Sequence, residues 1–357
     1  PYAHFMIPDQ MVIFDNVQQT LTCLNICYLD ADEDPDMVYE LAMQDLHRLV
    51  CLVNATPQPP VFSKTDPVTL KSLIPPSRYL AGVDTIKHHI REGDIFQAVY
   101  SQPFTCKTNL DPILFYRAQR YINPSPYMFF MNFGDKVIAG SSPETMVRLE
   151  NTVATLRPIA GTRPRGTTEQ QDQALADELL ADEKERAEHV MLIDLGRNDL
   201  GRVAEPGTVQ VTDTMVIERY SHVMHLVSNI TCDLKKTCDA LDLFAATFPA
   251  GTLTGAPKIK AMEIISKLEN RPRKIYGGAA GYISFTGNMD FAITIRTAVM
   301  ENQTLTVQAG AGIVYDSDPE TELEECKNKA KSVGAALKLA LSHTPLSHIP
   351  PSPTNGG

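Results

Sequence analysis

Two pairs of glutamates have the spacing that could hold a hard metal ion. Glu185 and Glu188 are three residues apart, and so are Glu322 and Glu325. Side chains three apart lie on one face of a helix, and magnesium takes oxygen ligands, usually one or two carboxylates with waters and substrate oxygens. The spacing fits a divalent cation, although a solvated acidic face or acidic residues at a helix start would give the same pattern.

Arg296 and His225 are the next candidates for chemistry. Arg296 lies in segment 291–299, where apolar and polar residues alternate as in a half-buried strand. A buried arginine pairs with a carboxylate through its planar fork, and that carboxylate could belong to the protein or to a substrate. His225 follows an apolar stretch, where a histidine either packs in the core or transfers protons near neutral pH.

Four segments of small residues are the third feature. They are Gly161-Thr162, 248–257, 276–281 and 308–312. Glycine is favoured where the backbone approaches another strand or a ligand closely. Because backbone N–H groups in such segments can bind anions, we expect an anion site near the carboxylates.

The elements that must position these residues are strands and helices without regular alternation. Residues 11–29 alternate like strands, whereas 35–53 and 182–195 have helical spacing, with Asp34 as the first helix cap and Pro319 near a further helix start. Strands and helices without βαβ alternation favour an α+β fold over a doubly wound sheet. The chain has no GxGxxG or Walker motif, so nucleotide binding has little support.

The amino-acid composition of the chain limits the kinds of partner and site that we expect. The 357 residues include 43 acidic and 32 basic side chains, for a net charge of −11, which argues against a nucleic-acid groove. The seven cysteines form no CxxC pair, so we expect neither a disulfide framework nor a zinc site, and a reducing compartment such as the cytoplasm. No apolar run approaches the roughly 20 residues of a membrane helix.

Three regions are expected along the chain. Residues 1–60 read as the remainder of an N-terminal subdomain, because strand-like sequence begins almost at once. The natural N-terminus is expected upstream, where an organellar transit peptide would also have room. Residues 61–341 read as one large domain, and the Pro- and Ser-rich tail 342–357 is predicted to be disordered.

From about residue 82 to residue 333 the sequence closely resembles the chorismate-utilising enzymes. This resemblance implies a large α+β fold, in which helices surround two facing antiparallel sheets and the active site lies between them. The matching segments are GDIFQ (93–97), NPSPYMFF (123–130), GSSPE (140–144), RPIAGTRPRG (157–166), DEKERAEHVMLIDLGRNDLGRV (182–203), VMHLVS (223–228), FPAGTLTGAPKIKAMEII (248–265), YGGAAGY (276–282), MDFAITIRT (289–297) and QAGAGIVYDSDPETELEE (308–325).

Two positions indicate which reaction of the family is expected. Relatives that add water to chorismate carry a lysine where this chain has Gln97, and aminodeoxychorismate synthases typically carry one where it has Ala160. Without either lysine, the resemblance implies ammonia as the nucleophile, and so anthranilate synthase activity: chorismate and ammonia give anthranilate and pyruvate, the first step of tryptophan biosynthesis. The alternatives are an aminodeoxychorismate synthase of folate biosynthesis and an inactive chorismate-binding paralogue.

The resemblance also implies roles for matched positions. Magnesium would bind the ring carboxylate, Thr252 matches a threonine near the departing hydroxyl, and His225 matches a histidine tied to pyruvate elimination. The metal ligands implied are Glu188 and Glu325, with Glu185 and Glu322 beside them. The substrate-binding residues implied are Tyr276 and Arg296, which grip the enolpyruvyl carboxylate, together with Gly161, Thr162, Gly310, Ala311 and Gly312.

Two partners follow from the same resemblance. The chain has no cysteine in a recognisable amidotransferase context, so a separate glutamine amidotransferase subunit is expected to supply ammonia. Relatives bind feedback tryptophan between an upstream LLES-like segment and a loop that matches Pro126, Tyr127 and Met128 here. Since the chain contains the loop but no LLES, tryptophan regulation is expected only when the upstream segment is present.

Overall fold

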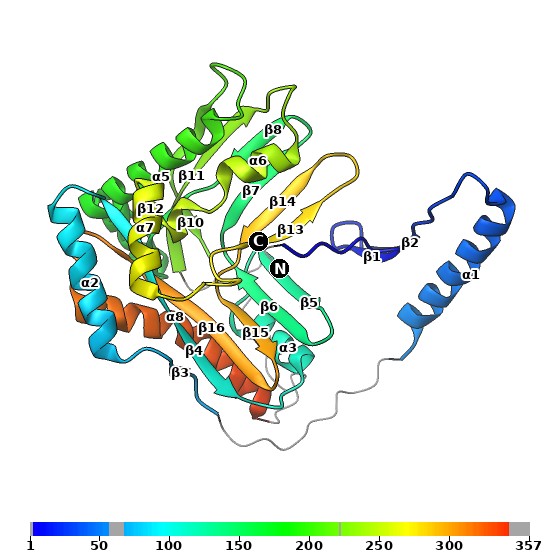
Figure 1. Cartoon of the computed structure of the whole chain (residues 1–357), viewed down its shortest axis with the longest axis horizontal. Helices are drawn as coiled ribbons and strands as arrows, with labels where there is room; N and C mark the ends of the chain where they lie inside the picture. The colour runs from blue at the N-terminus through cyan, green and yellow to red at the C-terminus, as the bar shows by residue number, and fades with distance from the viewer. Residues whose placement is uncertain (1–2, 57–67, 221–222, 343–357) are drawn as a thin grey trace. The chain divides into compact units, whose positions relative to one another are not determined.

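The computed structural model describes residues 3–56, 68–220 and 223–342 (Figure 1). The chain divides into two compact units, residues 1–61 and 62–357, and each is described by itself. The predicted boundary between residues 60 and 61 lies outside the described residues, as does the predicted tail apart from Ser342. None of the helices in the described ranges has the length and apolar character that crossing a membrane requires.

The first unit is a hairpin followed by one helix. Strand β1 (Gln10–Asp15) pairs antiparallel with β2 (Thr20–Asn25), and α1 spans Pro35–Asn54. The Asp34 side chain caps α1 by accepting a hydrogen bond from the N–H of Asp36. These elements confirm the predicted strand and helix. Neither strand nor α1 contains a buried residue, so the apolar side chains of this unit lie at its surface.

The second unit contains two seven-stranded sheets, in which every pairing is antiparallel. The first sheet has the order β10-β11-β8-β7-β14-β13, with β9 also paired to β11. Its strands are β7 (Thr145–Glu150), β8 (Val153–Leu156), β9 (Ile159–Pro164), β10 (Gln210–Arg219), β11 (Val223–Asp233), β13 (Ala279–Ile283) and β14 (Met289–Ile293).

The second sheet has the order β12-β4-β16-β15-β6-β5, with β3 also paired to β4. Its strands are β3 (Lys71–Ser72), β4 (Gln97–Lys107), β5 (Tyr127–Asn132), β6 (Lys136–Ser142), β12 (Gly255–Ala256), β15 (Thr297–Glu301) and β16 (Thr304–Ile313). Strands β4 and β16 pair along ten consecutive positions and form the long centre of this sheet.

Helices cover both sheets (Figure 1). Helices α4 (Glu169–Ala181), α5 (Glu183–Gly201) and α6 (Ala240–Thr247) pack on the first sheet. Helices α2 (Pro76–Arg91), α3 (Pro112–Ile122), α7 (Lys258–Glu269) and α8 (Pro319–Leu341) pack on the second. A short 3-10 helix, η1 (Gly251–Leu253), contacts β4 and β16. The α+β fold with two antiparallel sheets surrounded by helices is therefore confirmed.

The prediction of a single strand over 291–299 is wrong. Strand β14 ends at Ile293 in the first sheet, and β15 begins at Thr297 in the second. Between them Arg296 has a φ of 47°, and its carbonyl accepts hydrogen bonds from Gln119 Nε2 at 2.6 Å and from the N–H of Ser141 at 3.3 Å. Two short strands on either side of a crossing have the same alternation as one long strand, so the pattern did not reveal the break.

Candidate active site

His225 faces a bulge in the first sheet. Thr162 pairs with His225 and Ala160 pairs with Leu226, which leaves Gly161 as the extra residue of β9. Gly161 has a φ of 59°, a conformation that favours glycine. Its carbonyl lies 3.0 Å from His225 Nδ1, and Thr162 Oγ1 lies 3.1 Å from the same nitrogen. Because a carbonyl can only accept, Nδ1 carries the proton, which leaves Nε2 of the neutral ring as a proton acceptor.

The surroundings of His225 favour its neutral form. Burial lowers the pKa of His225, the hydrogen bond to the Gly161 carbonyl partly offsets this, and the charge of Arg296 lowers the pKa further. The ring also packs edge-on against Tyr220, with 5.6 Å between the ring centroids. At neutral pH this histidine is suited to accept a proton.

Arg296 lies in the short segment that connects strand β14 of the first sheet to strand β15 of the second. Burial lowers the pKa of its guanidinium, and the charge of Glu144 opposes this effect. Among the described residues, no carboxylate forms an ion pair with Arg296 within 4.0 Å. A largely buried cation without a bonded counter-charge is suited to bind an anion. The structure thus favours a ligand carboxylate over a protein aspartate as the partner of this arginine.

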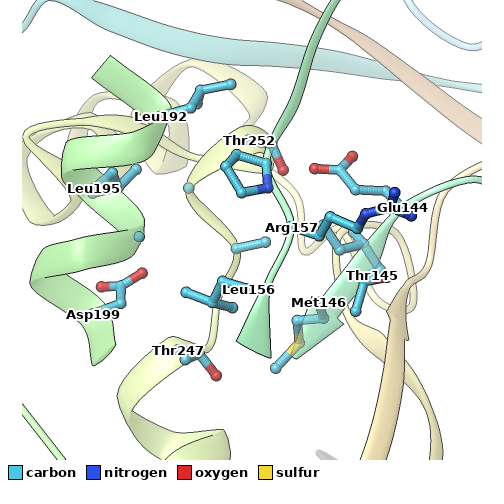
Figure 2. A pocket seen from close by; sticks show the side chains of 15 residues that line it. Glu144, Thr145, Met146, Leu156, Arg157, Leu192, Leu195, Asp199, Thr247 and Thr252 are labelled. Carbon is cyan, nitrogen blue, oxygen red and sulfur yellow. The ribbon is translucent and has the colours of Figure 1, made fainter. Parts of the chain in front are cut away.

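Glu144 is a site residue that the sequence analysis did not single out. It lies between β6 and β7, and burial raises the pKa of its carboxyl to about 7 despite the opposing effects of Thr252, Lys329 and Arg296. Figure 2 shows the Glu144 carboxylate and the Thr252 hydroxyl pointing toward one another at a small cavity. The Thr252 hydroxyl is buried and has no hydrogen-bond partner with normal geometry in the described part of the chain.

The four predicted metal ligands come from two helices. Glu185 and Glu188 lie in α5, whereas Glu322 and Glu325 lie in the first turns of α8. Burial raises the pKa of Glu188, and the nearby charges of Glu185 and Glu325 raise it further. Burial likewise raises the pKa of Glu322, with a contribution from Glu325. The two helices therefore bring negative charges together from distant parts of the sequence.

Basic and amide side chains lie beside three of these four glutamates. Glu325 pairs with Lys329 at 2.7 Å, and Glu185 lies 3.6 Å from Arg163. Glu188 accepts a hydrogen bond of 3.2 Å from Gln97 Nε2. Within the described ranges, no three Asp, Glu, His or Cys side chains meet as a metal-binding group. A magnesium site of one or two carboxylates, completed by waters and substrate oxygens, needs no third ligand, so the residues fit such a site.

Strand β16 lies beside Tyr276. Gly310 pairs with Ser101, and a Cβ at Gly310 would lie 2.9 Å from Tyr276 Oη. Gly310 therefore lets the Tyr276 phenol approach the strand. The Ala311 side chain is fully buried in the core, so only its backbone could contact a ligand. Lys329 Nζ donates to the Gly310 carbonyl at 2.9 Å, which makes Lys329 a second site residue that the sequence analysis missed.

The predicted regulatory residues line part of a larger cavity. Pro126 and Tyr127 contribute to a cavity of about 540 Å³ that is also lined by Arg148 and Asp290. Tyr127 Oη donates to Asp290 Oδ1 at 2.8 Å, while Met128 pairs with Ser141 in the sheet. Tryptophan binding by these residues stays a prediction.

Electrostatic interactions connect the parts of the site. The charge of Arg296 lowers the pKa of both His225 and Glu144, and the charge of Glu144 raises the pKa of Tyr276. The charge of Lys329 also lowers the pKa of Glu144, and Lys329 forms an ion pair with Glu325. His225, Arg296, Tyr276 and Glu325, together with Glu144 and Lys329, are thus linked in one region served by both sheets. This region combines carboxylates with two cations, which suits it to an anionic ligand.

The chain belongs to the family of chorismate binding enzymes, whose pattern matches residues 1–334. A relative from Acinetobacter calcoaceticus, named anthranilate synthase component 1, is 48% identical over 346 residues, which are 95% of this chain and 69% of the relative. This similarity spans both units of the chain.

Solved structures agree with this placement. The crystal structure of anthranilate synthase component I from Streptococcus pneumoniae is similar with a TM-score of 0.81 at 42% identity, covering 91% of this chain and 72% of that one. The menaquinone-specific isochorismate synthase from Escherichia coli is more distant, with a TM-score of 0.74 at 25% identity over 84% of this chain and 69% of that one.

Proposed function

We propose that this chain is the chorismate-converting component of an anthranilate synthase, a lyase that forms anthranilate and pyruvate from chorismate and ammonia. The relatives named anthranilate synthase component 1 support this proposal. The observation that carries it is Gln97, which donates to Glu188 at the edge of the site. An amide cannot act as a base, so the lysine that would activate water in isochorismate-forming relatives has no counterpart here.

Binding of chorismate would rely on Arg296 and on backbone and hydroxyl groups of β9 and β16. Arg296 has no bonded counter-charge among the residues that the structure describes, and together with Tyr276 it would bind the enolpyruvyl carboxylate through charge-assisted hydrogen bonds. Backbone groups of Gly161 and of residues 310–312, with the Thr162 hydroxyl, would contact the remaining substrate oxygens. The rigid strands β9 and β16 hold these groups in place before the substrate arrives.

Amination needs an acid for the departing hydroxyl. Ammonia attacks carbon 2 of the ring while the hydroxyl at carbon 4 leaves. Glu144 would donate the proton to that oxygen, because burial raises its pKa to about 7 and so keeps much of the carboxyl protonated at neutral pH. The Thr252 hydroxyl, which has no partner with normal geometry within the described residues, would donate to or accept from the same oxygen.

Elimination of pyruvate needs a proton acceptor near the ring. Nε2 of His225 would accept the proton from carbon 2 as the bond between carbon 3 and the enolpyruvyl oxygen breaks and the ring becomes aromatic. The enolate that leaves takes a proton from solvent on its methylene carbon and becomes pyruvate. The fixed tautomer supports this role, because the Gly161 carbonyl engages Nδ1.

The proposal includes magnesium and two partners. Glu188 and Glu325, with Glu185 and Glu322 beside them, would hold Mg²⁺, which when bound supplies positive charge for the ring carboxylate. A separate glutamine amidotransferase subunit would supply ammonia. Tryptophan would bind at Pro126, Tyr127 and Met128 when an upstream segment is present. All seven cysteines are free, which supports a reducing compartment such as the cytoplasm.

Product identity tests the proposal. The purified chain is incubated with chorismate, ammonium and Mg²⁺, and the products are separated by chromatography with fluorescence detection of anthranilate. An Arg296→Gln variant serves as the matched negative control, and Arg148→Gln, at a half-exposed site, controls for loss of charge. Accumulation of aminodeoxychorismate without anthranilate would favour the folate-pathway reaction, and no conversion at all would favour an inactive paralogue.

A further inference from the structure

A buried ion pair outside the residues assigned so far connects several parts of the site. Glu269 is the last residue of α7, and Arg273 follows four residues later. Arg273 Nε donates to Glu269 Oε2 at 2.8 Å and Nη2 donates to Oε1 at 2.6 Å, so the two groups form a two-pronged contact. Only 17% of the Arg273 side chain and 3% of the Glu269 side chain are exposed.

Arg273 also donates hydrogen bonds to the backbone of η1 and of β4. Nη1 donates to the Leu253 carbonyl at 2.5 Å, directly after Thr252 in η1, and Nη2 donates to the Val99 carbonyl at 2.6 Å. The guanidinium carbon also lies 5.7 Å from the centre of the Tyr276 ring, a cation–π distance. One side chain therefore contacts the turn that carries Thr252, the strand β4 and the face of Tyr276.

Glu269 extends the network to β16. Its Oε1 accepts hydrogen bonds from the N–H of Ser101 at 3.0 Å and from Ser101 Oγ at 2.8 Å. Ser101 is the partner of Gly310 in the sheet, and Ser101 Oγ also accepts from Gln308 Nε2 at 2.8 Å. The pair thus also fixes the part of β16 that the Tyr276 phenol approaches.

Stability alone is a weak reason for such a pair. Replacing a buried ion pair by well-packed apolar residues is often neutral or stabilising. The Thr252 hydroxyl faces the Glu144 carboxylate, and the backbone of η1 holds Thr252 in that position. Arg273 holds that backbone through the Leu253 carbonyl. We propose that Arg273 is a positioning residue that sets Thr252 and Tyr276 for the reaction, an inference that rests on the proposed function.

Lysine is the sharpest replacement for Arg273. Lysine keeps the charge beside Glu269 but lacks the planar fork, so it cannot bind both carbonyls and face the Tyr276 ring together. A misplacement of about 1 Å near a reacting group can cost roughly 10²-fold in rate. We therefore expect Arg273→Lys to lower kcat about 10- to 100-fold. Arg165→Lys is the matched control, because Arg165 also forks onto a carboxylate, Asp172 (2.7 and 3.1 Å), and donates to a carbonyl, that of Tyr220.

A double-mutant cycle separates positioning from general support of the fold. If Arg273 acts through Thr252, then Thr252→Ala should cost far less in the Arg273→Lys background than in the wild type, because the hydroxyl is already misplaced. Purely structural support predicts that the two fold-losses in kcat multiply. Thermal melting of each variant is measured alongside, and Arg165→Lys should lower the melting temperature similarly while kcat stays within about threefold.

Two further arms keep the test decisive. Should Arg273→Lys fail to fold, Glu269→Gln replaces it in the cycle, since it leaves the arginine in place but removes the opposing charge, and the same non-multiplicative result is expected. Multiplying losses, or an undiminished kcat in the folded variant, would overturn the positioning role alone. A wild-type chain that makes no anthranilate would instead contradict the proposed function.

Discussion

Replacing Glu144 by glutamine should stabilise the protein at high pH while it slows the reaction. Burial raises the pKa of the Glu144 carboxyl from 4.5 to about 7. Because the folded pKa is the higher one, the stability contributed by the protonated carboxyl is complete below pH 4.5 and is lost as the pH rises through 7. The difference between the two values corresponds to about 3 kcal/mol at about 1.4 kcal/mol per pKa unit.

Urea unfolding of the wild type and of Glu144→Gln at several pH values measures this effect. Every other titrating group is shared, so the difference in unfolding free energy between the two proteins isolates Glu144. That difference should move in favour of the variant by up to about 3 kcal/mol between pH 4.5 and pH 8, with most of the change between pH 5 and pH 8. Over the same range kcat of the wild type should fall above pH 7 as the acid ionises, and the variant should lose roughly 10²–10⁴-fold in kcat.

Two outcomes would refute this reasoning. A difference in unfolding free energy that does not change with pH would mean that Glu144 titrates near its ordinary pKa in the folded protein. A variant with undiminished kcat would mean that another group protonates the leaving hydroxyl. A Glu150→Gln variant, at an exposed position on β7, is the control for removal of one carboxylate and should show neither effect.

The remaining predictions concern the metal, the ammonia source and the second half-reaction. Glu188→Gln or Glu325→Gln should weaken Mg²⁺ binding in calorimetry and remove most activity, because a neutral amide replaces a charged ligand; near-normal turnover at limiting Mg²⁺ would contradict the metal site. Ammonium salts should support the reaction of the purified chain and glutamine alone should not, whereas turnover with glutamine alone would contradict a separate amidotransferase. His225→Ala should accumulate an aminated, non-aromatic intermediate that keeps its enolpyruvyl group, as seen by mass spectrometry; equal loss of both steps with lowered thermal stability would indicate packing instead.

Local sequence patterns were sufficient for much of the fold. The helix predicted from residue 182 to residue 195 begins as expected after the Asp182 cap, whose side chain accepts from the N–H groups of Lys184 and Glu185. It continues to Gly201, and Gly196, Asp199 and Leu200 are buried along this extension. The spacing of apolar residues within one segment predicts such a helix without any contact from elsewhere in the chain.

The rest depended on contacts between distant segments. Glu144 looks like an ordinary residue after a strand, and only the folded structure brings the Thr252 hydroxyl and the Arg296 charge, more than 100 residues later, close to its buried carboxyl. Arg296 was singled out, but its place at a crossing between sheets was not, because both short strands alternate in the same way. Lys329 reads as one basic residue in a charged helix until β16 places the Gly310 carbonyl beside it.

The central claim is that ammonia, rather than water, adds to chorismate at this site and that pyruvate then leaves. The most direct measurement is mass spectrometry of the products formed by the purified chain from chorismate, ¹⁵N-ammonium and Mg²⁺. The proposal predicts anthranilate that carries the label, together with an equal amount of pyruvate. Isochorismate without label, or a labelled product that still bears its enolpyruvyl group, would contradict it.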